Sequence, residues 1–179
     1  MKGDENMSDL LKKIETRRSI RKYKPDMIPK EDIDRIIRAG TYAASGRGAQ
    51  CPIIIAVTNR EVRDRLSRLN AQIMGSSGDP FYGAPVVLAV LADRQRGTYI
   101  CDGSLVIGNM MLAAHELGIG SCWIHRAKEE FETPEGREIL DSLGIKGDYE
   151  GIGHCILGYV DGDYPEPPAR QEGRVFYID

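Results

Sequence analysis

Residues 101–117 constrain the fold more than any other part of the sequence, because a helix built from them is apolar on nearly every side. Such a helix has to be buried all round, either inside the domain or between subunits. The rest of the chain therefore has to supply enough structure to cover it, alone or together with a second copy. The apolar residues of this helix are Leu105, Val106, Ile107, Met110, Met111, Leu112, Ala113 and Ala114.

Two further apolar runs, at residues 53–58 and 85–93, are short and rich in β-branched side chains. They are typical of strands in the middle of a sheet that is covered on both faces. Capping residues and apolar periodicity also predict helices. We expect helices at 8–16, at 60–74, at 133–143 and from Pro29 to Gly40, and shorter strands at 121–124, 154–159 and 175–178.

The length of 179 residues and the hydrophobic share of 41% fit a single globular domain, which we place at residues 1–179. Residues 1–7 are expected to be flexible. Prolines fix residues 163–170 as extended chain, and the strand predicted at 175–178 then needs a sheet edge on which to dock.

Charge and composition exclude several classes of function. The formal net charge is −3, whereas nucleic acids and anionic membranes bind basic surfaces, so neither is an expected partner. The four cysteines form no CxxC pair and the three histidines do not fall at metal-ligand spacing, which predicts that no metal is bound. The sequence begins without an apolar signal segment, and we expect a cytoplasmic location.

Three arginines and a serine lie within five residues, as Arg17, Arg18, Ser19 and Arg21. Arginine supplies a planar fork of charged donors, and serine adds a short, rotatable hydrogen bond. A cluster of this size suits one phosphomonoester. The alternative is a solvated basic helix end that interacts with the helix dipole.

The sequence has no motif that would supply a catalytic nucleophile, acid or base. The run that starts at Gly118 begins like a dinucleotide fingerprint, but Trp123 stands where the third glycine belongs and the run follows a helix. This absence suits a protein whose chemistry is carried by a bound organic cofactor.

Several short motifs, in their order and spacing, resemble the nitroreductase superfamily of flavin mononucleotide (FMN) enzymes over essentially the whole chain. The resemblance implies an α+β, nitroreductase-like fold with a mostly antiparallel central sheet flanked by helices. It also implies an intertwined homodimer with two FMN sites at the interface, in which residues 163–179 wrap the partner subunit. The motifs are RRSIR from Arg17, AASGRGAQ from Ala43, GAP from Gly83, LGIGSCW from Leu117, LGY from Leu157 and PPAR ending at Arg170.

This resemblance assigns FMN contacts to the basic cluster. Arg17 and Ser19 match the residues that hold the FMN phosphate, and Arg170 matches the tail arginine that completes that site. Arg18 matches a residue that reaches the ribityl chain or the pyrimidine ring. Arg21 would lie near the flavin N1/O2 edge, where a fixed cation stabilises the negative charge of reduced flavin.

Residues from the middle of the chain match the segments that surround the flavin ring. Trp123, Ile124 and His125 match a stretch that lies against the isoalloxazine ring and offers backbone N–H groups to its N5 and O4 edge. His125 would act there through its amide. Asn70 matches a polar side chain on the pyrimidine ring, and Tyr82 is a candidate for the substrate pocket.

The loop after the second helix departs from the family pattern. Ser45 keeps it and Ala44 stands in the place of the family's proline, both as candidate FMN contacts, but Gly48 stands where relatives carry an asparagine that approaches flavin and substrate from the partner subunit. Arg47 is the candidate for replacing that polar contact, and its positive charge would suit an anionic substrate.

The resemblance implies an FMN-dependent oxidoreductase that works by a ping-pong mechanism. NADH or NADPH delivers hydride to flavin N5 and leaves, and an electron-poor acceptor (a nitroaromatic, a quinone or an enone) then collects the electrons. No side chain is needed as a catalytic acid or base. The alternative is a protein that binds FMN without turnover, as a carrier or sensor.

Overall fold

The computed structural model describes residues 9–179. The flexibility predicted for residues 1–7 and the helix start predicted at Ser8 therefore lie outside the described residues. In chain order the elements are α1 (Asp9–Thr16), α2 (Lys30–Thr41), the 3-10 turn η1 (Gly46–Gly48), β1 (Pro52–Val57), α3 (Arg60–Met74), β2 (Val86–Asp93), α4 (Tyr99–Glu116), β3 (Gly120–Ile124), α5 (Ala127–Glu132), α6 (Pro134–Ser142) and β4 (Tyr149–Gly158).

The four strands form one sheet in the order β1-β2-β4-β3, and every neighbouring pair is antiparallel. The strand predicted at 53–58 is present, but its expected place in the middle of the sheet is wrong, since β1 is an edge strand and Ala56 is exposed. The apolar run at 53–58 indicates that both faces of the strand are covered. It does not indicate whether the strand has a neighbouring strand on one side or on both.

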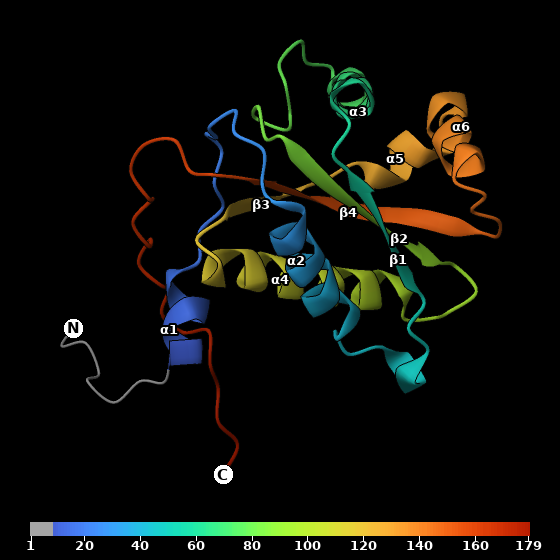
Figure 1. The fold of residues 1–179 in the computed structure, drawn as a ribbon. Helices are drawn as coiled ribbons and strands as arrows, with labels where there is room; N and C mark the ends of the chain where they lie inside the picture. The colour runs from blue at the N-terminus through green and yellow to red at the C-terminus, as the bar shows by residue number, and fades with distance from the viewer. Residues whose placement is uncertain (1–8) are drawn as a thin grey trace.

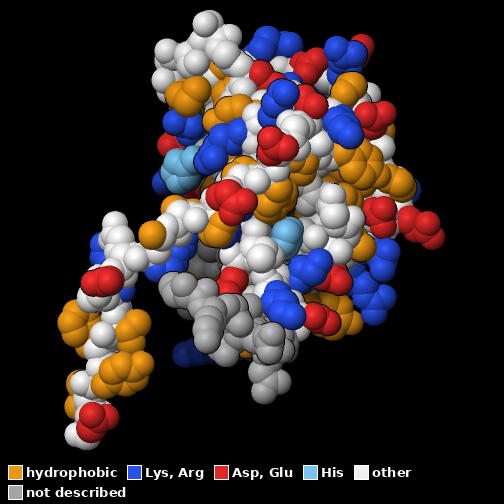
Figure 2. Space-filling view, turned by 90° about the vertical axis from the view of Figure 1, so that its left-hand side faces the viewer, with side chains coloured by type: hydrophobic (Ala, Val, Ile, Leu, Met, Phe, Trp, Pro, Cys, Tyr) orange, Lys and Arg blue, Asp and Glu red, His pale blue; other side chains and the backbone are white. Residues whose placement is uncertain are grey.

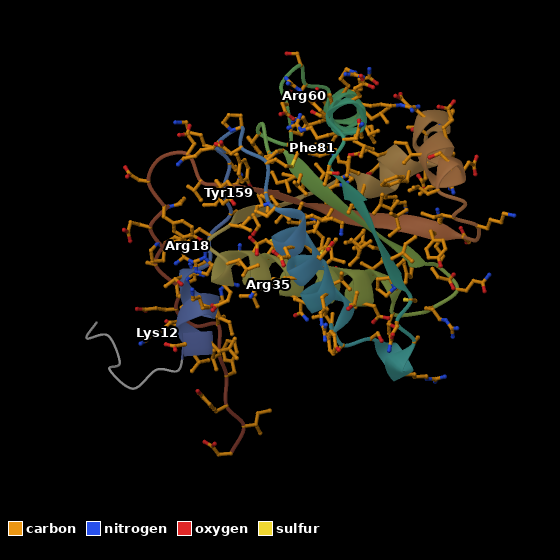
Figure 3. The ribbon with its side chains drawn as sticks, viewed as in Figure 1. Lys12, Arg18, Arg35, Arg60, Phe81 and Tyr159 are labelled. Atoms are coloured by element: carbon orange, nitrogen blue, oxygen red, sulfur yellow. The ribbon has the colours of Figure 1, made fainter. Side chains whose placement is uncertain are left out.

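Helices cover both faces of the sheet (Figure 1). The helices α3, α5 and α6 lie over one face, around a core that includes Leu66, Phe81 and Phe131. The helices α2 and α4 lie over the other, around a core that includes Ile36 and Met110. Figure 3 shows Phe81 between α3 and the sheet. The predicted α+β fold with a helix-flanked antiparallel sheet is thus confirmed.

The helix α4 is buried against the sheet and α2, but not on every side. An added Cβ at Gly40 of α2 would lie 2.7 Å from Cγ of Met110, so the small residue allows the two helices to approach closely. Ile100 and Leu105, on the remaining side, keep about half of their surface exposed. The prediction that α4 needs more cover than one chain supplies fits this uncovered side.

The tail after β4 contains neither helix nor strand, and the strand predicted at 175–178 does not form in the single chain. Figure 2 shows the end of the tail standing away from the body of the molecule with its apolar side chains uncovered. Phe176 is 85% and Ile178 is 101% exposed. A strand requires hydrogen bonds to a sheet edge, and residues 175–178 meet none within the described chain.

Candidate functional site

The basic motif lies beside the edge strand β3. Ser19 forms a parallel bridge with Ser121, and the N–H of Ile20 donates to the Ser121 carbonyl over 2.9 Å. Further along, Tyr23 bridges to Val160, beyond the end of β4. The segment therefore extends the sheet and holds the basic side chains against it, where α1 ends (Figure 3).

Two arginines of this motif carry nitrogen atoms that are buried but have no hydrogen-bond partner. They are Nη1 of Arg17 and Nε of Arg18, and the buried hydroxyl of Ser121 also lacks a partner, within the residues that the structure describes. Buried polar groups normally have partners, and a charged N–H without one is costly. Three such groups around one short segment form a site that an anion would complete.

The surroundings of Cys122 place three of the predicted residues together. Burial raises the pKa of the Cys122 thiol. The positive charges of Arg21 and Arg17 lower it, and so does a hydrogen bond with Ser19. All three side chains therefore lie close to the same point of β3. The structure thus brings Arg17, Ser19 and Arg21 together, and Arg18 is next to them in the chain.

Arg170 is not brought to this cluster. Its Nη2 and Nε atoms donate to the carbonyl of Pro168, two residues away, and the tail around it is exposed. The contact predicted between Arg170 and the phosphate-binding residues is therefore absent within one described chain. It stays a prediction for a second copy.

The turn from β3 into α5 follows Trp123, Ile124 and His125. The indole of Trp123 packs on Gly153 of β4, where an added Cβ would lie 2.7 Å from Nε1 of Trp123. Ile124 is buried, and His125 is exposed. Asn70 is 0% exposed, and its Nδ2 donates to the carbonyl of His125 over 2.8 Å.

A second group of predicted residues surrounds the loop after α2. Here the carboxylate of Asp102 is almost fully buried, and it accepts hydrogen bonds from the N–H of Gly46, the thiol of Cys51 and the hydroxyl of Thr98. The Ser45 hydroxyl accepts from the N–H of Gln50 over 3.0 Å. No local sequence pattern reveals the role of Asp102, which depends on a loop more than fifty residues away.

This loop has an unusual backbone. Arg47, Gly48 and Gln50 all have positive φ angles, of 55°, 66° and 48°. Only glycine adopts such angles freely, so Arg47 and Gln50 hold a conformation that the loop contacts enforce. The Arg47 side chain is exposed, and it extends from this fixed turn.

Two cavities of about 410 and 670 Å³ meet at this loop. Both are bordered by Thr41, Ala43, Ala44, Ser45 and Gln50. Gly48 borders the larger cavity, while Asp102 and the apolar Val106 border the smaller one. The loop thus has space for a ligand beside it, as expected of a substrate pocket.

The two groups of residues lie at opposite ends of α4. The loop is held by Asp102 near the start of that helix, and His115 near its end contacts Thr16, which precedes the basic motif. Asp102 and His115 lie about 20 Å apart along the axis, at about 1.5 Å per residue. Figure 1 shows α4 running across the molecule between them. One chain therefore provides two partial sites.

Among residues 9–179, the side chain of Tyr82 forms no hydrogen bond to either of these two groups. It has a φ of 53° and is 42% exposed. Burial raises the pKa of Tyr23, with smaller effects from Cys122, Cys155, Arg21 and Tyr82. Tyr82 thus acts electrostatically on Tyr23, and its place in a substrate pocket stays a prediction.

Within residues 9–179, no set of three or more His, Cys, Asp or Glu side chains is arranged to hold a metal ion. No helix in that range combines the length and apolar composition needed to cross a bilayer.

Comparison with known proteins gives one consistent match. The profile of the nitroreductase family matches residues 14–159. A nitroreductase from Bacteroides fragilis, solved with bound FMN, is 30% identical and superposes with a TM-score of 0.86, covering 97% of this chain and 100% of its own. A second one with FMN, from Desulfitobacterium hafniense, is 26% identical with a TM-score of 0.85, covering 97% of this chain and 100% of its own.

Two archaeal relatives carry the provisional name NADH dehydrogenase/NAD(P)H nitroreductase. The one from Archaeoglobus fulgidus is 34% identical over 158 residues, which cover 86% of each chain. The one from Methanothermobacter thermautotrophicus is 34% identical over 125 residues, which cover 68% of this chain and 63% of that protein. The matched part thus spans less than two thirds of the second relative.

Proposed function

The chain belongs to the nitroreductase family, and from this premise we propose that it is an FMN-dependent oxidoreductase that uses NADH or NADPH. The observation that carries the proposal is the set of buried, unpartnered polar atoms at Arg17, Arg18 and Ser121. These donors suit a phosphate, which is the charged part of FMN. Solved relatives with the same fold contain FMN.

The residues present fit the cofactor. Arg17 and Ser19 would hold the phosphate, and the Ser121 hydroxyl, which the sequence motifs did not single out, would add a further donor. Arg18 and Arg21 lie on either side of Ser19 in the chain and add positive charge beside β3. A fixed cation next to the flavin N1/O2 edge favours the reduced, negatively charged form.

FMN, when bound, supplies the two-electron chemistry that links a nicotinamide to an acceptor. The side chains of the protein bind and orient the reactants and provide electrostatic stabilisation. No buried acid or base is required of them. The turn at Trp123–Arg126 offers backbone N–H groups for the ring edge, and these are fixed because β3 and α5 are both packed in the core.

We propose that the working form is a homodimer in which each site combines two chains. The basic motif and the loop at Ser45 and Gly48 lie at opposite ends of α4, so one chain cannot bring them to the same ligand. The exposed Ile100 and Leu105 of α4 and the apolar residues of the tail supply surface for a partner. Arg170 of the tail would then reach the phosphate site of the other copy.

The acceptor is proposed to be an electron-poor compound, namely a nitroaromatic, a quinone or an enone, that uses the same site after the nicotinamide has left. The cavities beside Ser45 and Gln50 give it room, and Arg47 supplies a positive charge next to them.

A visible spectrum of the purified protein tests the proposal. We expect the visible absorption of bound FMN, loss of that absorption when NADH or NADPH is added without oxygen, and recovery with a quinone. Bound flavin that no nicotinamide reduces would favour a carrier or sensor instead. A protein that takes up no FMN would refute the proposal.

A further inference from the structure

A chain of three buried polar side chains leads from the central strand β4 to the turn between β3 and α5. His154, Glu130 and Asn70 are each 0% exposed. Nε2 of His154 lies 2.9 Å from Oε2 of Glu130, and Nδ2 of Asn70 donates to Oε1 of the same carboxylate. The second hydrogen of Nδ2 reaches the carbonyl of His125, over 2.8 Å.

The donors and acceptors of these side chains determine the direction of each hydrogen bond between them. Nδ1 of His154 has no partner within the described residues, whereas Nε2 faces the Glu130 carboxylate, which can only accept, so a proton is placed on Nε2. His154 then donates to Glu130, and Asn70 donates to both Glu130 and His125. Through the His125 carbonyl, these buried side chains are linked to an exposed residue.

Stability alone does not account for these residues. The His154 ring lies among aromatic side chains, with its centroid 5.2 Å from that of Phe81 and 6.2 Å from that of Phe131. Replacing a buried polar pair by apolar residues of similar size is often neutral or stabilising. A polar pair in such a core is therefore better explained by what it positions.

The geometry of the peptide bond shows what is positioned. In a trans peptide the C=O of one residue and the N–H of the next point in opposite directions, and none of the described peptide bonds is cis. Because the His125 carbonyl points inward to Asn70, the N–H of Arg126 points away from the core. Arg126 has a φ of 77°, so this turn would not be adopted without support.

The helix α5 that carries Glu130 is itself held in place. An added Cβ at Gly151 of β4 would lie 2.2 Å from the Ala127 carbonyl oxygen, and one at Gly136 would lie 2.1 Å from the Glu130 carbonyl oxygen. Backbone therefore packs directly on backbone at both points. A rigid α5 keeps the Glu130 carboxylate at a constant distance from the turn.

We propose that Glu130 and His154 are positioning residues that act through Asn70 to aim the Arg126 N–H at the bound flavin. This inference rests on the proposed function, and it gives Asn70 a different role from the direct flavin contact predicted from the sequence. The three side chains do not touch the reactants. They set the orientation of one peptide that does.

The variant Glu130→Gln tests the proposal in the FMN-free and the FMN-loaded protein. In the FMN-free protein we expect the NMR order parameter of the Arg126 N–H to fall from about 0.85, typical of rigid backbone, to below about 0.6. In the loaded protein we expect a shifted flavin absorption spectrum and a changed midpoint potential. Ile139→Val is the matched control, because Ile139 packs in the same core from α6 and is not part of the polar chain, so all three quantities should stay unchanged.

The double variant Glu130→Leu/His154→Phe separates positioning from stability and covers the case in which Glu130→Gln does not fold. An apolar pair should keep the thermal midpoint close to that of the parent, while the Arg126 order parameter falls as before. An unchanged order parameter in either variant, or equal spectral changes in Ile139→Val, would overturn the proposal. If the parent protein bound no FMN, the proposed function would fail, whereas the FMN-free measurement would still decide whether Glu130 anchors the turn.

Discussion

The backbone N–H of Arg18 donates a hydrogen bond to the hydroxyl of Tyr164 over 2.9 Å, although 146 residues separate them. The same hydroxyl lies 3.0 Å from Nδ1 of His115, and Nε2 of that ring lies 2.9 Å from the hydroxyl of Thr16. Thr16 donates its own proton to the Lys12 carbonyl, so it accepts from His115. The tail is thereby joined to the basic motif through a neutral histidine.

This arrangement predicts that stability depends on pH through His115. Burial lowers its pKa below the usual 6.5, and the nearby charges of Lys13 and Arg17 act in the same direction. The unfolded chain then binds more protons than the folded one, so stability rises with pH and is lost as the pH falls below about 6.5. Thermal midpoints between pH 7.5 and 5 should fall less in His115→Gln than in the parent. Equal slopes in both proteins would show that His115 is not the titrating group.

Arg17→Ala should weaken FMN binding about ten- to a hundred-fold, since a hydrogen bond with a charged partner contributes about 1.5–3 kcal/mol. Riboflavin, which lacks the phosphate, should bind equally weakly to the parent and to the variant. Titration calorimetry with both flavins measures this. Arg35→Ala, on the exposed side of α2, is the control and should bind FMN like the parent. An undiminished FMN affinity in Arg17→Ala would remove Arg17 from the phosphate site.

Apolar periodicity was sufficient to predict most of the fold. The helix predicted at 60–74 has the observed bounds of α3, and the α4 and β2 predictions differ from the observed elements by two residues or fewer at each end. The helix α5 was missed because its six residues are too few to show a period. The start of β4 was missed because Gly151 and Gly153 lower the strand propensity, although both are needed for close packing.

The residues of the site were predictable only where a local sequence motif indicates which ligand is bound. Arg17 and Ser19 stand out because several phosphate donors are close together in the sequence. The contributions of Asp102, Glu130 and Ser121 depend on partners far along the chain, so no local pattern reveals them. The position of Arg170 depends on a second chain, and no inference from one sequence places it.

Gly151→Ala should destabilise the protein by about 1–3 kcal/mol, the usual cost of overpacking. The added methyl group would lie 2.2 Å from the Ala127 carbonyl oxygen, so α5 has to move away from β4. Gly97→Ala is the control, because nothing lies within 4 Å of the added Cβ. Chemical denaturation of both variants gives the comparison, and equal stability would mean that α5 does not pack on β4 as described.

Removal of residues 164–179 should weaken both the homodimer and FMN binding. The deletion removes the apolar side chains of Phe176 and Ile178, which are exposed in one chain, together with Arg170 and the Tyr164 link to Arg18. Sedimentation at decreasing concentration should show dissociation of the truncated protein at concentrations where the parent stays dimeric. A truncated protein that remains a stable, FMN-loaded dimer would contradict the proposed role of the tail.

The kinetics should show that nicotinamide and acceptor use one site in turn. Initial rates measured at varied concentrations of both should give parallel double-reciprocal lines, as a ping-pong scheme requires. Intersecting lines would reject it. Because positions 47 and 48 lie in the loop beside the two cavities, substitutions there should affect the acceptor and not FMN.

Two variants of this loop test that assignment. Gly48→Asn has to accommodate a φ of 66°, which asparagine tolerates better than most residues, so the loop should keep its shape. We expect the acceptor preference of this variant to change and its FMN affinity to stay the same. Arg47→Ala should lower kcat/KM about ten-fold for anionic acceptors and leave neutral ones unchanged, because an exposed cation acts mainly by attracting opposite charge. The comparison requires a pair of quinones that differ only in a sulfonate group. If both members of the pair lose activity equally, Arg47 does not select acceptors by charge, and the loop contributes to catalysis only through its shape.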